Sequence, residues 1–174
     1  RQAVSAGPPG DIDELVALVA AQDRLARRVE VDVASHHPTI DPILPELQVE
    51  LAGLAPKAPR IPIISTVDKA GPAPVFDAQH WVANLRNPVR FSQAVAAAGE
   101  RNSTFIEVSP HPLLTHAISD TLGDKHHHSL GTLARDTDDT VTFQTNLNTT
   151  RAPDTDGPSG HRVTLPATPW HHTR

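Results

Sequence analysis

The sequence predicts an α/β fold with a mostly parallel sheet, on three observations. Segments with helical hydrophobic spacing alternate with short segments of β-type spacing along most of the chain, as in parallel-sheet folds. Clusters of Pro and Gly mark turns or loops between several of these segments. The length of 174 residues fits about one ordinary domain with a sizeable core.

The first third of the chain predicts a helix, a strand and a second helix. Apolar residues recur at helical spacing over residues 11–27, and Asp11 followed by Glu14 has the form of a capping box. Apolar and charged residues then alternate over residues 29–33, which predicts a short strand. A second helix is expected over about residues 42–54.

The remainder of the chain predicts further helices, two strands and a tail. The tail is expected to be extended or disordered, because residues 151–159 are polar and rich in Pro and Gly. Threonines lower the helix propensity of the last helical segment. Helices are expected over about 77–85, 88–99, 113–122 and 138–148, and strands over 104–108 and 129–133.

Charge and composition exclude several classes of protein. With 15 Lys+Arg against 20 Asp+Glu, the net charge is −5, so we expect no nucleic-acid partner. The absence of Cys excludes a disulfide scaffold and a thiol nucleophile, and it fits a cytoplasmic protein. No apolar run has the length of a membrane helix, so no membrane is expected as a partner. The chain begins at Arg1 and holds no Met, so we expect it to be part of a longer protein.

A histidine at the end of a predicted strand is the first candidate for chemistry. Residues 31–36 read V-D-V-A-S-H, so the strand delivers His36 to its own end, where α/β folds collect ligands and catalytic groups. A histidine there can serve as a general base, because its pKa is ordinarily near neutral. Position alone favours the alternative, a structural histidine at a turn.

Two further motifs look structural by spacing alone. Residues 81–91 resemble a helix junction, and residues 105–114 resemble a strand, turn and helix.

The other histidines do not suggest a metal site. Adjacent histidines point in different directions, so no metal site is expected. The histidines that invite a metal reading are His111, His116 and His126 to His128, and the pair at 171–172 is expected to be solvated.

Together the three motifs resemble one family. V-D-V-A-S-H at 31–36, W-V-A-N-L-R-N-P-V-R-F at 81–91 and F-I-E-V-S-P-H-P-L-L at 105–114 occur in this order. The chain resembles the C-terminal half of the acyltransferase domain of modular type I polyketide synthases, and more broadly malonyl-CoA:acyl-carrier-protein transacylases. L-P-A-T-P-W at 165–170 is similar to the linker after this domain.

The resemblance implies a division of the chain into three parts. Residues 1–33 would be part of a small ferredoxin-like subdomain. Residues 34–150 would be the C-terminal part of an α/β-hydrolase-like parallel-sheet subdomain. Residues 151–174 would be the start of the post-acyltransferase linker.

The resemblance also implies roles for five residues. His36 matches the catalytic histidine, and Asn84 matches the position whose main-chain carbonyl orients that histidine. Val33, Ala34 and Ser35 match positions that help to sort extender units. The small Ser35 in place of phenylalanine leaves room for a methyl group, so methylmalonyl is favoured over malonyl. His37 receives no role.

The activity implied by the resemblance is transfer of an extender acyl group from coenzyme A to an acyl carrier protein, by a serine–histidine ping-pong mechanism. The substrate is a coenzyme A thioester, with no covalently bound cofactor. The expected partners are the acyl carrier protein and the adjoining synthase domains, namely the ketosynthase and the linker. Arg86, Arg90 and Arg101 could face the carrier, although a solvated helix face is the alternative for each.

The nucleophile of the family is expected to lie outside this chain. It is a serine in G-x-S-x-G, and no two of the 9 glycines here stand four residues apart. The family's carboxylate-binding arginine and first oxyanion segment are likewise expected to be missing. The isolated chain should therefore be inactive, and poorly folded or dependent on the missing half. The alternative is a non-catalytic remnant, or a linker or interaction fragment, of a broken synthase.

Overall fold

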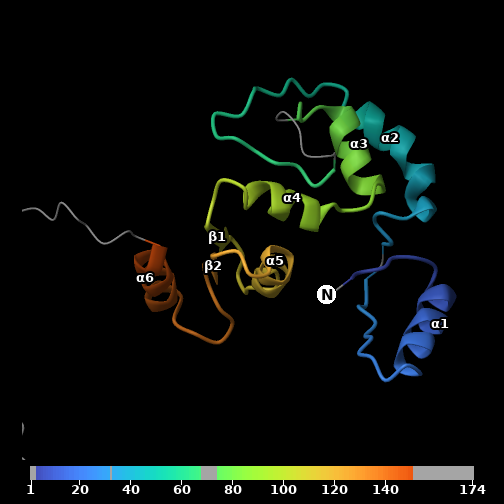
Figure 1. The fold of residues 1–174 in the computed structure, drawn as a ribbon. Helices are drawn as coiled ribbons and strands as arrows, with labels where there is room; N and C mark the ends of the chain where they lie inside the picture. Colours follow the sequence, from blue (N-terminus) through green and yellow to red (C-terminus); the bar gives the residue numbers. More distant parts are fainter. Residues whose placement is uncertain (1–2, 32, 68–73, 151–174) are drawn as a thin grey trace, which may run out of the picture.

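A computed structural model describes residues 3–31, 33–67 and 74–150 (Figure 1). Its elements alternate between helix and strand only in the second half of the chain. In order they are α1 (Pro9–Ala20), the 3₁₀ helix η1 (Pro38–Ile43), α2 (Leu44–Glu50), α3 (Ala78–Arg86), α4 (Phe91–Ala98), β1 (Thr104–Glu107), α5 (Thr115–Leu122), β2 (His128–Gly131) and α6 (Asp139–Thr150).

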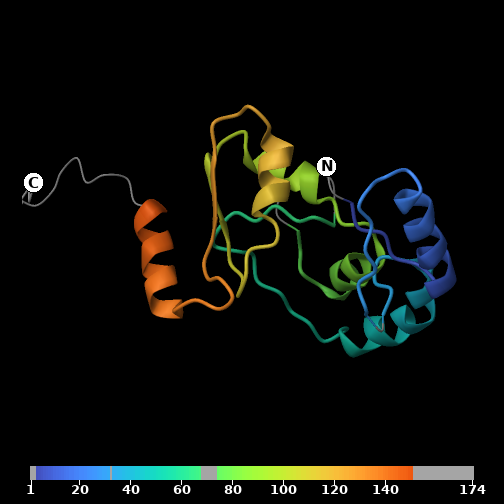
Figure 2. The same cartoon turned by 90° about the horizontal axis from the view of Figure 1, so that it is seen from below.

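The sheet confirms the predicted fold class. Strands β1 and β2 pair in parallel, from Thr104 opposite His128 to Glu107 opposite Gly131. Helix α5 connects the two strands, as a parallel pair requires. The described part of the chain therefore contains one β–α–β unit, with α4 packed beside α5 (Figures 1 and 2).

The core lies where α4, α5 and β1 meet. Val95, Ile118 and Leu122 are buried there, and Phe91 and Phe105 pack against them. Two glycines permit the close packing. A Cβ atom at Gly99, at the end of α4, would collide with the Leu122 side chain, and one at Gly131 would lie 2.9 Å from Cβ of Pro112. Helix α6 stands at one end of the molecule in both ribbon views (Figures 1 and 2).

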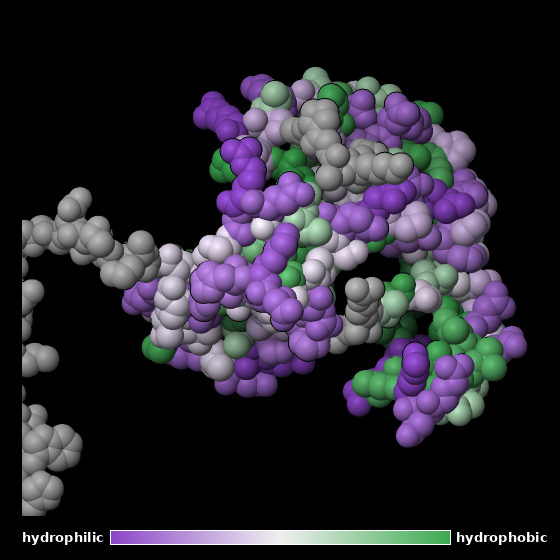
Figure 3. All heavy atoms as spheres, in the orientation of Figure 1, coloured by the Kyte–Doolittle hydropathy of each residue, from purple (hydrophilic) through white to green (hydrophobic). Residues whose placement is uncertain are grey.

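The lobe around α1 exposes many apolar side chains. No described residue of α1 is buried, and Leu18 is 56% exposed. The segment that follows continues the pattern, with Leu25, Val29 and Val31 each more than two-thirds exposed. Figure 3 shows the apolar residues gathered over this lobe. Such side chains are ordinarily covered in a folded domain, so this face resembles an interface more than a solvated surface.

The first third of the chain departs from the expected elements. The helix predicted over 11–27 ends at Ala20, and residues 29–31 and 33 form no strand. The strand prediction was wrong for the described residues because alternation sets only which side each residue faces. A strand also needs a partner, and the ladder here joins only β1 and β2. The helix predicted over 42–54 begins as η1, with Pro42 inside it, and α2 ends at Glu50.

The later elements agree closely with the predictions. Helix α3 begins after Asp77, whose Oδ1 accepts a hydrogen bond of 2.9 Å from the His80 main-chain N–H. The helix predicted from residue 88 begins at Phe91. The predicted tail at 151–174 lies outside the described residues. Within the described residues no helix is long and apolar enough to cross a membrane.

Glu107, at the end of β1, links this strand to the start of α5 through hydrogen bonds to its carboxylate. Its Oε1 accepts from the Leu113 N–H at 2.8 Å and the Ser109 hydroxyl at 3.1 Å. Its Oε2 accepts from the N–H groups of Leu114 at 2.8 Å and Thr115 at 3.1 Å. Burial raises the pKa of Glu107, but these hydrogen bonds outweigh burial and hold it below the ordinary 4.5. The F-I-E-V-S-P-H-P-L-L motif thus carries a structural carboxylate.

We expect the stability of the chain to fall in acid because of Glu107. A lowered folded-state pKa adds stability that is present above pH 4.5 and is lost as the pH falls through the folded-state pKa. Urea unfolding of an acyltransferase domain that contains this chain, followed by circular dichroism between pH 7 and pH 3, measures this loss. The Glu107→Gln domain should show a flatter profile below pH 4.5; an identical profile would assign the acid sensitivity to other groups.

Candidate active site

His36 lies in a turn between the segment after α1 and η1, and the end of α3 holds it. Its main-chain N–H donates to the carbonyl of Leu85 at 2.8 Å. Its ring Nδ1 lies 2.7 Å from the carbonyl oxygen of Asn87. Both partners lie 49 or more residues further along the chain, so the fold, rather than local sequence, positions this ring.

The carbonyl partner fixes the tautomer of the His36 ring. A carbonyl oxygen can only accept, so Nδ1 must carry the proton and donate it to Asn87. In the neutral ring Nε2 is then the unprotonated nitrogen, with its lone pair available. The arrangement leaves the ring ready to take a proton from a hydroxyl or a thiol.

The structure corrects the orienting residue from Asn84 to Asn87. Asn84 is still inside α3, so its carbonyl points along the helix axis toward Pro88, which has no N–H. Asn87 has extended backbone, with φ −83° and ψ 154°, which turns its carbonyl out of the helix toward the turn at His36. The prediction for Asn84 located the correct helix end but the wrong carbonyl.

From the sequence, no structural role at this site was expected for Arg86, His37 or Asn87. Arg86 donates from Nε to Oδ1 of Asp41, which joins α3 to η1. His37 caps η1 by accepting the Thr39 N–H on its Nδ1 at 3.2 Å. The break of the helix at Asn87 could have been found from the proline that follows it, because a residue before proline avoids helical backbone.

The three residues immediately before His36 differ in their exposure to solvent. Val33 is 54% exposed, whereas Ala34 and Ser35 are half-buried. Their contact with a substrate remains a prediction.

Among the described residues, no group of three or more His, Asp or Glu side chains could hold a metal. His127 hydrogen bonds to the Ser119 hydroxyl at 3.0 Å and to the Lys125 carbonyl at 2.7 Å.

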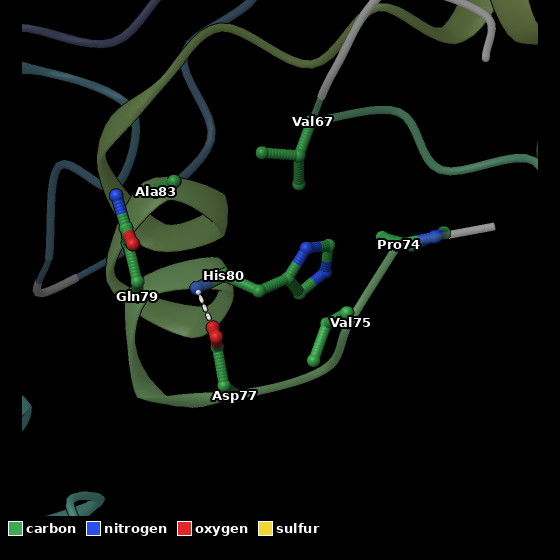
Figure 4. A pocket seen from close by; sticks show the side chains of 7 residues that line it. All are labelled: Val67, Pro74, Val75, Asp77, Gln79, His80 and Ala83. Atoms are coloured by element: carbon green, nitrogen blue, oxygen red, sulfur yellow. Dashed lines mark hydrogen bonds between the residues drawn. The ribbon is translucent and has the colours of Figure 1, made fainter. Parts of the chain in front are cut away.

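A hollow of about 270 Å³ lies at the opposite end of α3 from His36 (Figure 4). His80 is buried, at 8% exposed, and its ring points into this hollow between Val67 and Val75. The His80 ring makes T-shaped contacts with two aromatic rings: with Phe76 at 4.9 Å between ring centres, and with Trp81 at 5.5 Å. A second hollow, of about 150 Å³, separates the sheet from α6. His36 lines neither of them.

Comparison with known proteins settles the family. Residues 1–156 match the family model described as the acyl transferase domain. The chain belongs to the acyl transferase domain family. It is 57% identical over 175 residues to one of the phenolphthiocerol/phthiocerol polyketide synthase proteins of Mycobacterium tuberculosis. That alignment covers 100% of this chain and 10% of the relative, so the chain spans about a tenth of the relative's length.

Solved acyl transferase domains have the same fold. The acyltransferase domain of phenolphthiocerol/phthiocerol synthase A from Mycobacterium bovis (BCG) is 50% identical, with a TM-score of 0.70 over 74% of this chain and 52% of that chain. The acyltransferase domain from module 8 of the salinomycin polyketide synthase is 38% identical, with a TM-score of 0.76 over 81% of this chain and 34% of that chain. This chain therefore corresponds to part of a polyketide synthase acyl transferase domain.

Proposed function

We propose that this chain is the base-bearing part of an acyltransferase domain that moves an extender acyl group from coenzyme A to an acyl carrier protein. The nucleophilic serine of this reaction lies outside the chain. One observation carries the proposal: the His36 ring is held through Nδ1 by a main-chain carbonyl, which leaves Nε2 as the base. Membership of the acyl transferase domain family supports it.

In the proposed first step, Nε2 of His36 takes the proton of the serine hydroxyl as its oxygen attacks the thioester carbonyl. The carbon–sulfur bond breaks, and coenzyme A leaves as a thiol after His36 returns the proton. In the second step His36 takes the proton of the carrier's thiol, whose sulfur attacks the acyl-serine ester. The serine leaves with that proton. The Asn87 carbonyl stabilises the imidazolium that forms in each step.

The proposed partners are the acyl carrier protein and the adjoining synthase domains. Of the three arginines considered for the carrier, Arg86 is engaged by Asp41 and is a poor candidate. Arg101 is exposed and Arg90 is half-buried, so Arg101 is the better one. A cytoplasmic location and the absence of a covalently bound cofactor are further parts of the proposal.

The extender unit is proposed to be methylmalonyl, on the small side chain at Ser35. We expect Ser35→Phe to shift the ratio of kcat/KM values from methylmalonyl-CoA toward malonyl-CoA by about tenfold, because one methyl group in an apolar pocket is worth about 1–3 kcal/mol. Competition between the two thioesters, read by the mass of the loaded carrier, measures the ratio. A matched control is Ser129→Phe, at a half-buried serine on β2. A ratio that Ser35→Phe leaves unchanged would remove Ser35 from the specificity site.

A loading assay tests the proposed function. An acyltransferase domain that contains this chain is incubated with methylmalonyl-CoA and an acyl carrier protein, and the mass gained by the carrier is measured. The 174-residue chain alone should form no acyl-enzyme, because it has no G-x-S-x-G. An inactive complete domain would favour the alternative, a non-catalytic remnant. A covalent acyl-enzyme on the chain alone would overturn the placement of the nucleophile.

A further inference from the structure

Three consecutive residues at the end of α3 hold the His36 turn. Leu85 accepts the His36 main-chain N–H, Asn87 accepts from its ring, and Arg86 between them pairs with Asp41, five residues after the histidine. The two carbonyl contacts fix the histidine itself. The ion pair fixes η1, the element into which the turn continues.

The backbone of His36 requires such support. Its φ is +65°, in the left-handed region that residues other than glycine seldom adopt. A strained conformation of this kind persists only where the surroundings impose it. Ile40, four residues after His36 in η1, is buried at 5% exposed. The Asp41–Arg86 pair adds a directional link from η1 to the same helix end that holds the ring.

We propose that Asp41 and Arg86 are positioning residues that keep the His36 ring on the Asn87 carbonyl. The side chain of Arg86 is 29% exposed and that of Asp41 is 53% exposed, so the pair is accessible to solvent and contributes to geometry more than to global stability. Its consequence for catalysis rests on the proposed function. Its consequence for the ring does not, because the tautomer of His36 can be measured whether or not the domain transfers an acyl group.

The tautomer of His36 tests the proposal directly. In an acyltransferase domain that contains this chain, long-range ¹H–¹⁵N NMR should show the proton of neutral His36 on Nδ1. Asp41→Asn and Arg86→Gln should each move part of the population to the Nε2–H tautomer. The exchanged pair Asp41→Arg with Arg86→Asp should restore the parent tautomer. Asp13→Asn is the matched control, because it breaks the 2.8 Å pair of Arg28 and Asp13, an ion pair away from the site.

Two results would overturn the proposal. One is a His36 tautomer that neither single variant changes while the spectrum stays dispersed. The other is an equal change in Asp13→Asn, which would indicate a general loss of structure. The circular dichroism of each single variant separates positioning from misfolding, because a variant that only moves the ring keeps the helical signal of the parent.

A kinetic measurement on the same complete domain extends the test to catalysis. There Asp41→Asn should lower kcat about ten- to a hundredfold with little change in KM, because small displacements of a reacting group have effects of this size. The exchanged pair should recover most of the loss. If the parent domain transfers no acyl group, the proposed function fails and the NMR result still decides the role of Asp41. If the domain is active and Asp41→Asn changes neither kcat nor the tautomer, only the positioning role fails.

Discussion

His36→Ala is expected to lower acyl transfer by about 10²–10⁴-fold in an acyltransferase domain that contains this chain. The variant removes the nitrogen that takes the proton in both proposed steps and returns it to each leaving group. The structure gives that nitrogen one orientation, because the other ring nitrogen is held by the Asn87 carbonyl at 2.7 Å. The initial rate at which an acyl carrier protein gains the acyl mass measures the effect.

Two controls make this result specific to His36. His126→Ala removes an exposed histidine outside the site and should leave the rate unchanged. Circular dichroism should show that His36→Ala retains the helical content of the parent. A His36→Ala domain that keeps the parent rate would contradict the assignment of the base. A rate lost together with the helical signal would call for the milder His36→Gln before the assignment is judged.

Glu107→Gln is expected to lower the free energy of unfolding by about 2 kcal/mol. Hydrogen bonds to a charged group are each worth about 1.5–3 kcal/mol, and the amide keeps only one acceptor oxygen for donors that now use two. The loss of negative charge at the start of α5 removes a further favourable interaction with the helix dipole. Urea unfolding at pH 7, followed by circular dichroism, measures the difference.

The matched control is Glu100→Gln, the same substitution at an exposed glutamate after α4. It should change the free energy of unfolding by less than about 0.5 kcal/mol, as surface substitutions usually do. Equal effects of the two substitutions would mean that the hydrogen bonds of Glu107 do not support the β–α–β unit. Both variants are made in an acyltransferase domain that contains this chain.

Local sequence patterns were sufficient to predict a helix or strand where the element and the residues it packs against lie close together in the sequence. The span from Asp77 to Leu122 contains a capping residue, a proline break and apolar residues that face a nearby core, and the predicted elements there differ from the structure by only a few residues. The parallel pairing of β1 and β2 followed from the same pattern, since a helix between two short strands favours it.

The sequence patterns did not predict the structure where contacts between residues far apart in the chain determine it. Residues 29–31 and 33 alternate correctly for a strand but have no partner in the described residues, so the pattern alone could not form a ladder. The motif points to Asn84 rather than to Asn87 as the orienting carbonyl because a motif gives positions and not backbone angles. Nothing in the sequence near Asp41 indicates Arg86, because a contact across 45 residues leaves no periodic pattern.

The distances along the chain between contacting residues also bear on the order of folding. The β–α–β unit closes within the 28 residues from Thr104 to Gly131, so little loop entropy opposes its formation. The contact between His36 and Asn87 spans 51 residues and includes a loop with no regular structure described between α2 and α3. Contacts of greater separation generally form more slowly. The β–α–β unit is thus placed to nucleate folding, and the histidine acquires its final geometry only when the longer loop closes.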